Sequence, residues 1–369
     1  MKKALCILLA LTMLFVLVAC GSNGETIPTT APDGGTTAAD DSTAAPDDSS
    51  TAPDDDTASG TMKLGVSWNF MINESATETK AFIDEMANER GFSVVHLVAD
   101  GDAAQQIADV KDLVSQKCDV VAVVPVDSSA STTMIQTCQD AGIPYINFNR
   151  PLSAETSIQP AASIVPDSEG QAYDSCVSCI DQMLEAGITQ IRILNIIGSL
   201  TDENAVNRDK GVKRCVEDYK AKDVDVEILA DLECDWDNEW ITSNLPASLN
   251  ANPDANMIYN PSDYCAGAVA ASLETAGRWV TYEDENHVWV ASTDVYIDGY
   301  QYLLEGYFDS NTLLSNTMIS EAVVEAAEFI YNGGDYGDDW DILVPCPLYI
   351  RDNAQDKEMI DLLSYKDQL

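Results

Sequence analysis

Side chains that can bind hydroxyl groups stand where apolar segments of this chain end. Arg150 and Asp294 each close a predicted strand, and Arg208 lies near the start of a predicted helix. A guanidinium group presents parallel donors to two adjacent hydroxyl oxygens, and a carboxylate accepts hydrogen bonds from hydroxyls. Trp236 adds an indole, which can cover the apolar C–H face of a sugar ring at little entropic cost. The opposite charges balance, which suits a small neutral polyhydroxy molecule better than an anion.

The same sequence offers little for catalysis. The only histidines, His96 and His287, both lie in strand patterns, which favours structural roles for them. The motifs of a serine hydrolase elbow, a zinc protease and a phosphate-binding loop do not occur. The acidic stretch 335–341 lacks the residue order of a calcium-binding EF-hand loop. We therefore expect a binding protein and not an enzyme, without a cofactor or a metal.

Alternating strand and helix patterns must position the candidate binding residues. Apolar segments of strand length alternate with segments of helical periodicity from residue 63 to the C-terminus. Strands are predicted at 63–67, 93–99, 119–125, 143–148, 191–197, 226–231, 255–260, 287–292, 312–318 and 342–348. Helices are predicted at 74–90, 103–116, 129–141, 168–185, 203–219, 238–250, 264–276, 298–305, 321–331 and 355–363.

Such a series requires right-handed crossovers, parallel sheets and helices on both sheet faces. Two consecutive series predict an α/β protein with two doubly wound, Rossmann-like lobes joined by a hinge. Ligands of these sheets bind beyond the carboxyl ends of the strands, so we expect a cleft between the lobes that closes by a hinge motion.

The N-terminal segment predicts export and a lipid anchor. Lys2 and Lys3 precede an apolar run, 4–19, that is too short to be a comfortable membrane span. The run ends in Leu-Val-Ala-Cys at Cys20, which resembles the bacterial lipobox. The resemblance implies that residues 1–19 are a lipoprotein signal peptide and that Cys20 is lipidated. Residues 20–61, rich in Thr, Ala, Pro and Asp, then form a disordered acidic tether.

Charge and cysteine content narrow the possible partners and environments. The formal net charge of −43 argues against nucleic acid or an anionic membrane face as a partner, so the membrane is reached through the lipid only. Export permits disulfides among the cysteines of the domain, but sequence does not give their connectivity. We expect Cys118 and Cys138, at the same sheet edge, to pair. Cys176 and Cys179, inside a helical pattern, are either buried thiols or one local bridge.

From residue 62 to 369 the chain resembles the type I periplasmic binding proteins of the ribose and multiple-sugar group. Residues 143–150, Ile-Pro-Tyr-Ile-Asn-Phe-Asn-Arg, resemble the family's Ile-Pro-Val-Ile-x-x-Asp-Arg. The resemblance implies that Asn149 and Arg150 bind sugar hydroxyls, with Asn149 in place of the usual Asp. Arg208, followed by Asp-Lys-Gly-Val, resembles the family's Arg-x-x-Gly-Phe, whose arginine reaches into the cleft.

Further motifs follow in the family order. Trp236 stands where the family often has an aromatic residue that stacks on the sugar. Residues 260–268 resemble the family's Asn-Asp-x-x-Ala-x-Gly-Ala, which makes Asn260 and Asp263 alternatives as well as partners in binding. Asp263 could equally cap a helix that starts there. Residues 290–294 resemble Val-x-Gly-Phe-Asp, so Asp294 becomes an acceptor at a strand end.

Two more segments carry less of the family pattern. The family usually shows Asn-x-x-Phe-Phe after the first strand, where this chain has Ser-Trp-Asn-Phe-Met. The order differs, and the expected lining residues there are Trp68, Asn69 and Phe70. Ser315 or Asn316 falls where the family often has a hinge glutamine.

The resemblance implies a monomeric, extracytoplasmic solute-binding protein, anchored to the outer face of the cell membrane. One lobe would comprise 62–166 plus about 316–344, and the other 167–315 plus about 345–369. The protein would capture a monosaccharide-like sugar and deliver it to an ABC-type permease.

Three alternatives share the cleft or the core. A sensory protein would present a sugar or an autoinducer-like diol to a membrane receptor, and a related transport protein would bind a nucleoside or an amino acid. A regulator of the lactose-repressor type would need a basic helix-turn-helix where this chain has a signal and an acidic tether.

Overall fold

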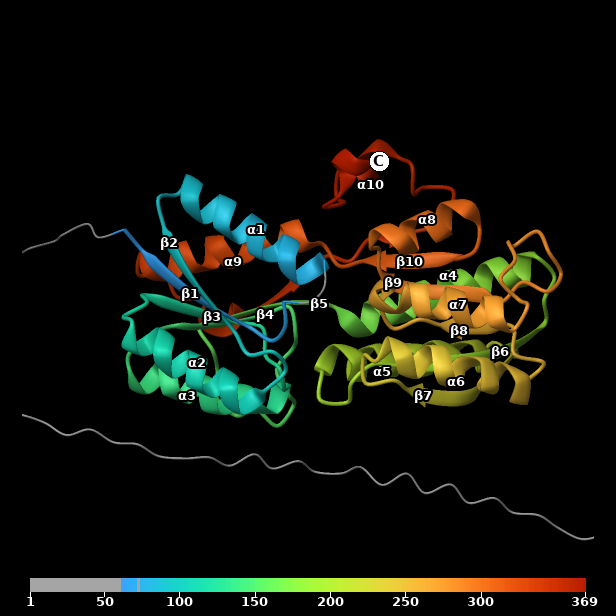
Figure 1. The fold of residues 1–369 in the computed structure, drawn as a ribbon, viewed down its shortest axis with the longest axis horizontal. Coiled ribbons are helices and arrows are strands. Elements are labelled where there is room, and N and C mark those ends of the chain that lie inside the picture. The colour runs from blue at the N-terminus through green and yellow to red at the C-terminus, as the bar shows by residue number, and fades with distance from the viewer. Residues whose placement is uncertain (1–60, 72–73) are drawn as a thin grey trace, which may run out of the picture. The chain divides into compact units, whose positions relative to one another are not determined.

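The computed structural model describes residues 61–71 and 74–369 (Figure 1). The predicted signal peptide, Cys20 with its predicted lipid, and all of the predicted tether except residue 61 lie outside the described residues. Within the described part of the chain, no helix combines the length and the apolar character that crossing a membrane requires.

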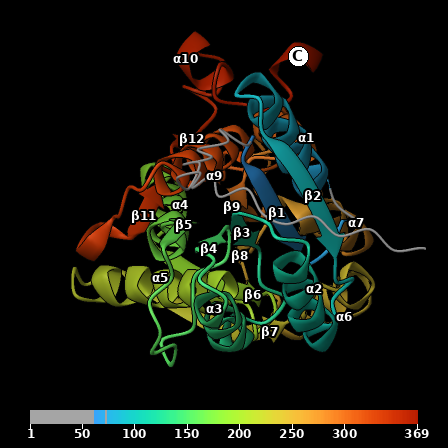
Figure 2. The same cartoon turned by 90° about the vertical axis from the view of Figure 1, so that its left-hand side faces the viewer.

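The first six-stranded sheet is parallel throughout, in the order β11-β5-β4-β3-β1-β2. Its strands are β1 (Lys63–Trp68), β2 (Ser93–Val98), β3 (Val120–Val123), β4 (Tyr145–Phe148), β5 (Ala162–Pro166) and β11 (Asp341–Val344). Helices α1 (Glu74–Glu89) and α9 (Asn316–Tyr331) cover one face, and α2 (Ala103–Ser115) and α3 (Ser131–Asp140) cover the other, as both views show (Figures 1 and 2).

Burial on both faces explains why β3 is an uninterrupted apolar run. Val120 and Ala122 belong to the core under α1 and α9, whereas Val121 and Val123 belong to the core under α2 and α3. Successive strand residues point to opposite faces, so a strand covered twice must be apolar at every position. All four residues are 0% exposed.

The second six-stranded sheet has the order β12-β10-β9-β8-β6-β7. Its strands are β6 (Gln190–Ile197), β7 (Asp225–Glu233), β8 (Met257–Tyr259), β9 (Trp289–Asp294), β10 (Ser310–Leu313) and β12 (Leu348–Tyr349). Strand β12 runs antiparallel to β10 at the sheet edge, and the other pairs are parallel. Helices α4 (Ser168–Glu185) and α5 (Glu203–Lys220) cover one face, and α6 (Asn238–Ala251), α7 (Ala266–Thr275) and α8 (Ile297–Glu305) the other.

Shorter elements complete the fold. They are α10 (Lys357–Ile360) and the 3-10 turns η1 (Ser128–Ala130), η2 (Asp263–Cys265), η3 (Gly337–Asp339) and η4 (Lys366–Gln368). The predicted helix 355–363 was therefore too long, since only Lys357–Ile360 is α-helical.

The chain passes between the two sheets after β5, after β10 and after β11. The prediction of a single strand over 342–348 was wrong: β11 ends at Val344 in the first sheet, and β12 begins at Leu348 in the second. Pro345 and Pro347 lie between them, and proline cannot donate to a strand ladder. Strand β5, just before the first crossing, was not predicted.

The expected disulfide between Cys118 and Cys138 is not present. Both thiols are free and buried in the core between α2, α3 and the sheet. Cys176 and Cys179 are likewise free and buried, so the alternative of a local bridge between them is also wrong. All cysteines that the structure describes are free thiols.

Candidate ligand-binding cleft

A cavity of about 470 Å³ opens where the carboxyl ends of the two sheets meet. It is lined by residues that follow β1, β3 and β4 of the first sheet and β6, β7, β8 and β9 of the second. Predicted residues among the lining are Trp68, Asn69, Phe70, Asn149, Arg150, Arg208, Trp236 and Asp294. The strand ends of parallel sheets are the usual ligand-binding edge of such folds.

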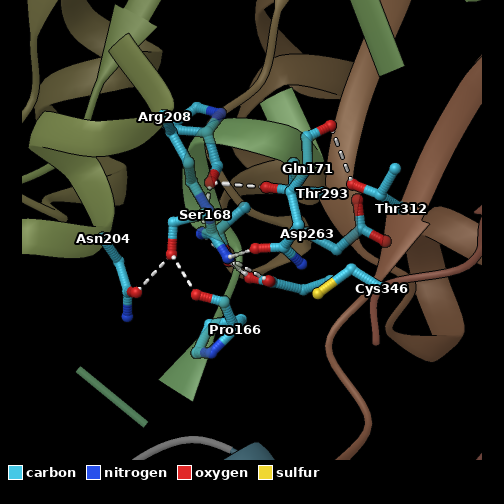
Figure 3. Close-up of polar contacts among 12 residues, drawn as sticks. Pro166, Ser168, Gln171, Asn204, Arg208, Asp263, Thr293, Thr312 and Cys346 are labelled. Carbon is cyan, nitrogen blue, oxygen red and sulfur yellow. Dashed lines mark hydrogen bonds and ion pairs between the residues drawn. The ribbon is translucent and has the colours of Figure 1, made fainter. Parts of the chain in front are cut away.

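Arg208 and Asp294 form a buried ion pair at the floor of the cavity. Arg208 Nη2 lies 2.6 Å from Asp294 Oδ1, and each residue is 3% exposed. The same nitrogen donates to Gln171 Oε1 at 3.0 Å, and Figure 3 shows Arg208 next to Gln171. Arg208 Nη1 donates to the carbonyl oxygen of Pro261 at 2.7 Å. Burial disfavours the charge of Arg208, but the carboxylate of Asp294 outweighs it, so the pKa of Arg208 is raised.

Asp294 reaches this position through an unusual backbone conformation. Its φ is +95° and that of Val295 is +53°, values that residues other than glycine rarely adopt. Ser262 Oγ donates to Asp294 Oδ2 at 2.5 Å, so both carboxylate oxygens are engaged. Strain of this kind persists where surrounding contacts enforce it, often at functional sites.

Arg150 and Asp202 form the second ion pair of the cavity lining, and it joins the two sheets. Arg150 follows β4, whereas Asp202 precedes α5, and Arg150 Nε lies 2.9 Å from Asp202 Oδ2. Arg150 Nη1 also donates to the carbonyl oxygens of Val126 and Pro125 at 2.9 and 3.2 Å. Asp202 Oδ1 accepts from the backbone N–H of Asn204 at 2.9 Å and so caps α5. One carboxylate therefore fixes a helix start and an arginine.

Asn204 adds an uncharged contact between the sheets. Its Nδ2 donates to the carbonyl oxygen of Asn149 at 3.1 Å, and its Oδ1 accepts from Ser168 Oγ at 2.6 Å. Figure 3 shows Ser168 between Asn204 and Pro166, at the point where the chain crosses from β5 to α4. The rim of the cavity is thus hydrogen-bonded directly to a crossing segment.

Trp236 forms part of the wall contributed by the second sheet. Its indole lies against Gly198, where an added Cβ would come within 2.3 Å of the ring, so only glycine leaves room for it. Asp235 and Trp236 have φ values of +49° and +60°, which turn the chain sharply after β7. Two buried donors of the lining, Trp236 Nε1 and Arg208 Nε, have no hydrogen-bond partner among residues 61–71 and 74–369.

Trp68, Asn69 and Phe70 form part of the opposite wall. Trp68 is 1% exposed, packs edge-on against Phe148, and donates from Nε1 to His96 Nδ1 at 3.0 Å. Asn69 Oδ1 accepts from the backbone N–H of Phe70 at 2.7 Å. The Phe70 ring covers Gly101, whose φ of +83° and missing side chain allow that contact.

Four predicted residues do not line the cavity. Asn260 is buried and donates to Ser292 Oγ at 2.9 Å. Ser315 caps α9 by accepting from the backbone N–H of Met318 at 3.2 Å. Asn316 accepts from Ser75 Oγ at 2.7 Å, and it donates to Glu78 Oε2 at 2.9 Å, which ties α9 to α1.

Asp263, the fourth of these residues, holds the loop beneath the cavity together. Its carboxylate accepts from Ser292 Oγ, from the backbone N–H of Tyr296 at 3.0 Å and from Asn311 Nδ2 at 2.7 Å. Burial raises its pKa to about 7, against the donors of Ser292 and Asn311, which lower it.

Sequence reasoning missed several lining residues. The most important is Asp202, whose position before a predicted helix is a capping signal but does not reveal a partner in the other sheet. Tyr296 lies two residues beyond the predicted Asp294. The remaining lining residues are Ser75, Ala76, Thr79, Gly101, Val124, Val126, Ser199, Thr201, Asn204, Asp235, Asp237, Ser262, Tyr264 and Leu314.

Two doubly wound lobes with a polar and aromatic cavity between their strand ends define the class of two-lobed α/β binding proteins. Within that class, the chain belongs to the periplasmic binding proteins, an extracytoplasmic family. The family model described as a periplasmic binding protein domain matches residues 64–335.

Relatives of established function are distant but cover most of the chain. A xylitol-binding protein of Mycolicibacterium smegmatis is 22% identical over 298 residues, which are 80% of this chain and 78% of the relative. A ribose import binding protein of Escherichia coli is 23% identical over 247 residues, which are 67% of this chain and 77% of the relative.

Solved structures share the fold. A solute-binding protein from Bacillus halodurans with bound myo-inositol has a TM-score of 0.70 at 23% identity, over 81% of this chain and 98% of the other. A solute-binding protein from Actinobacillus succinogenes with bound D-allose has a TM-score of 0.71 at 19% identity, over 80% of this chain and 100% of the other.

Proposed function

We propose that this chain binds a small neutral sugar or polyol in the cleft between its lobes and delivers it to an ABC-type permease. The observation that carries the proposal is the pairing of both arginines of the cavity lining. Arg150 is paired with Asp202 and Arg208 with Asp294. An anionic ligand would have to compete with these carboxylates, whereas a neutral polyol can accept hydrogen bonds without displacing them.

The rest of the lining supports the same ligand class. Trp236 Nε1 and Arg208 Nε are buried donors that hydroxyl oxygens could satisfy, and leaving such donors unpaired is costly. Trp236, Phe70 and Tyr264 supply aromatic surface for the C–H face of a ring. The volume of about 470 Å³ lies within the usual range for small-molecule sites. The relatives named for xylitol and ribose bind ligands of this class.

We propose reversible binding without covalent chemistry. Neither histidine lines the cavity. Of its four lining carboxylates, Asp202 and Asp294 are held by arginines, and Asp237 caps α6. In this proposal the lobes are residues 62–166 plus about 316–344 and residues 167–315 plus about 345–369. They close around the ligand by a hinge at the crossing segments, as a monomer. A sensory protein that presents its ligand to a membrane receptor is the alternative with the same cleft.

We also propose that residues 1–19 are a signal peptide, that Cys20 carries the lipid anchor, and that the segment up to residue 61 is a tether. Mass spectrometry of the membrane-extracted protein should find an acylated Cys20 as the first residue. Replacement of Cys20 by Ser should release the protein from membranes. Retention of that variant in the membrane fraction would argue against the anchor.

A thermal-shift screen tests the ligand class. The panel contains D-ribose, D-allose, xylitol and myo-inositol, together with nucleosides and amino acids. A ligand that binds only the native state stabilises it by mass action, by about 2.7 kcal/mol when the free ligand concentration is one hundred times Kd. The melting temperature rises accordingly. We expect stabilisation by a sugar or polyol. Stabilisation by amino acids or nucleosides alone would exclude the sugar assignment.

Trp236→Ala should abolish the ligand-induced shift while leaving a folded protein. Trp279→Ala is the matched control, because Trp279 stacks on Tyr307 at a centroid distance of 4.2 Å and does not line the cavity. The control should lose stability but keep the ligand-induced shift. An unchanged response of Trp236→Ala would remove Trp236 from the site.

A further inference from the structure

The Trp68 indole is held in the cavity wall by one hydrogen bond to a neighbouring strand. Trp68 Nε1 donates to His96 Nδ1 at 3.0 Å, and the two rings have a centroid distance of 6.0 Å. Strands β1 and β2 pair in parallel with Trp68 opposite Val98 and Val66 opposite His96, so both rings stand on the same sheet face. An indole nitrogen can only donate, so His96 Nδ1 must act as the acceptor.

The other ring nitrogen of His96 fixes the tautomer that makes this possible. His96 Nε2 lies 2.8 Å from Asp84 Oδ1 on α1. Burial opposes ionisation of Asp84, but hydrogen bonds from Lys80 and His96 hold the pKa of Asp84 below its usual value. An ionised carboxylate only accepts, so Nε2 carries the proton and Nδ1 of the neutral ring remains free to accept. The three residues thus form a directed chain from Trp68 through His96 to Asp84.

Protonation of His96 would break this chain at the indole. A second proton on Nδ1 would face the N–H of Trp68, and two donors would then oppose each other. The charged groups that act on the ring are Asp84 and Lys80, both on α1, and Lys80 Nζ is itself paired with Asp84 at 2.5 Å. From β1 the ring meets Val66 and Trp68, neither of which titrates. Burial lowers the pKa of His96, against Asp84, which raises it, so the neutral ring persists through neutral pH.

We propose that His96 is a positioning residue for ligand binding: its neutral ring holds the Trp68 indole in the cavity wall although His96 itself does not line the cavity. The inference rests on the proposed function, because it requires that Trp68 contact the bound sugar or polyol. Affinity is then constant at neutral pH and falls as His96 protonates below pH 6.5. Loss of one hydrogen bond at a partly buried site corresponds to a decrease in ligand affinity of about 3- to 10-fold.

Two substitutions separate positioning from general packing. In His96→Gln the amide oxygen can accept from Trp68 and the amide nitrogen can donate to Asp84, without a titratable group. This variant should bind D-ribose or xylitol with nearly wild-type affinity at pH 7.5 and should not weaken at pH 5.5. His96→Phe fills the space but offers no acceptor, so its affinity should be reduced about 3- to 10-fold at both pH values. His287→Gln, two residues before β9 of the second sheet, is the matched control and should keep the wild-type pH profile.

A ligand-free measurement tests the contact itself. The indole N–H resonance of Trp68 in ¹⁵N-tryptophan-labelled full-length protein is assigned with Trp68→Phe. In the wild type it should shift as the pH falls from 7.5 to 5, and in His96→Gln it should not. An indole resonance that is unchanged by His96→Phe, or a His96→Phe variant that binds like the wild type, would overturn the inference. If the wild-type protein binds no sugar or polyol, the proposed function fails, and the effect of His96→Phe on the indole resonance still decides whether His96 positions Trp68.

Discussion

Arg150 and Asp202 come from different lobes and meet in a buried ion pair, with Arg150 Nε 2.9 Å from Asp202 Oδ2. Their side chains are only 11% and 3% exposed. Because the pair spans the two sheets, it can form only while the lobes are together. Buried charges are tolerated when they are paired, so the Arg150–Asp202 pair is compatible with close contact of the two lobes at this point.

Asp202→Asn should weaken ligand binding by about 10- to 100-fold. An asparagine keeps the cap of α5, because its oxygen still accepts from the backbone N–H of Asn204, but it removes the charge opposite Arg150. Hydrogen bonds to charged groups are worth roughly 1.5–3 kcal/mol, and that free energy is lost only in the closed state. Titration calorimetry with the sugar found by the screen measures the change. Asp218→Asn, at an exposed position of α5, is the control, and equal affinities for both variants would contradict a role of the pair in closure.

Arg208→Met should reduce the free energy of unfolding by about 3–5 kcal/mol. The substitution leaves the Asp294 carboxylate, 3% exposed, without its cation, and an unpaired buried charge is strongly destabilising. Urea denaturation at pH 7 measures the loss. Arg214→Met is the matched control on the same helix: its pair with Glu169 is 47% and 37% exposed, so we expect less than about 1 kcal/mol. The double variant Arg208→Met, Asp294→Leu should recover part of the loss, and no recovery would mean that packing dominates.

Gly198→Ala should abolish ligand binding while the protein stays folded. The new Cβ would lie 2.3–2.5 Å from three indole atoms of Trp236, so the ring must leave its place in the cavity wall. Gly267→Ala in α7 is the control, because nothing lies within 4 Å of its added Cβ, and alanine in a helix adds about 0.5–1 kcal/mol of stability. Thermal shifts with the sugar distinguish the two variants. A Gly198→Ala protein with normal ligand response would show that the Trp236 position is not required.

Local sequence predicted those elements whose burial is the same along their whole length. Strand β3 is covered on both faces, so its apolar run was sufficient to identify it. Strand β5 was missed, and β11 was predicted to continue to residue 348. Pro166, Pro345 and Pro347 mark crossings between the sheets, and these crossings depend on the tertiary arrangement. No periodicity in a sequence tells which of two sheets a short edge strand will join.

In the candidate site, too, residues marked by a local signal were predicted, whereas pairings that depend on tertiary arrangement were not. Arg150 and Asp294 were found because the segments that contain them resemble family motifs, and parallel strands bring their carboxyl ends to one edge. Asp202 was missed because its cap is a local signal, whereas its pairing with Arg150 depends on how two lobes meet. For Asp263 the sequence left binding and capping open, and the structure uses the carboxylate to hold Tyr296 and Asn311 instead.

Asp263→Asn should remove part of the pH dependence of stability. Burial raises the pKa of Asp263 to about 7, above the ordinary value of 3.8, so the folded protein binds a proton that the unfolded chain releases. Stability from this group is therefore fully present below pH 4 and declines as the pH rises to about 7. Between pH 5 and pH 8 the decline amounts to about 2–3 kcal/mol.

Asparagine mimics the protonated acid at this position. Its oxygen can accept from the backbone N–H of Tyr296 and from Asn311 Nδ2, while its nitrogen can donate to Ser292 Oγ. We therefore expect the free energy of unfolding, measured by urea denaturation, to fall more in the wild type than in Asp263→Asn when the pH is raised from 5 to 8. Asp298→Asn, exposed in the first turn of α8, is the control and should leave the pH dependence unchanged. A wild-type protein that gains stability relative to Asp263→Asn between pH 5 and pH 8 would mean that the carboxylate is ionised in the fold, held by its three donors.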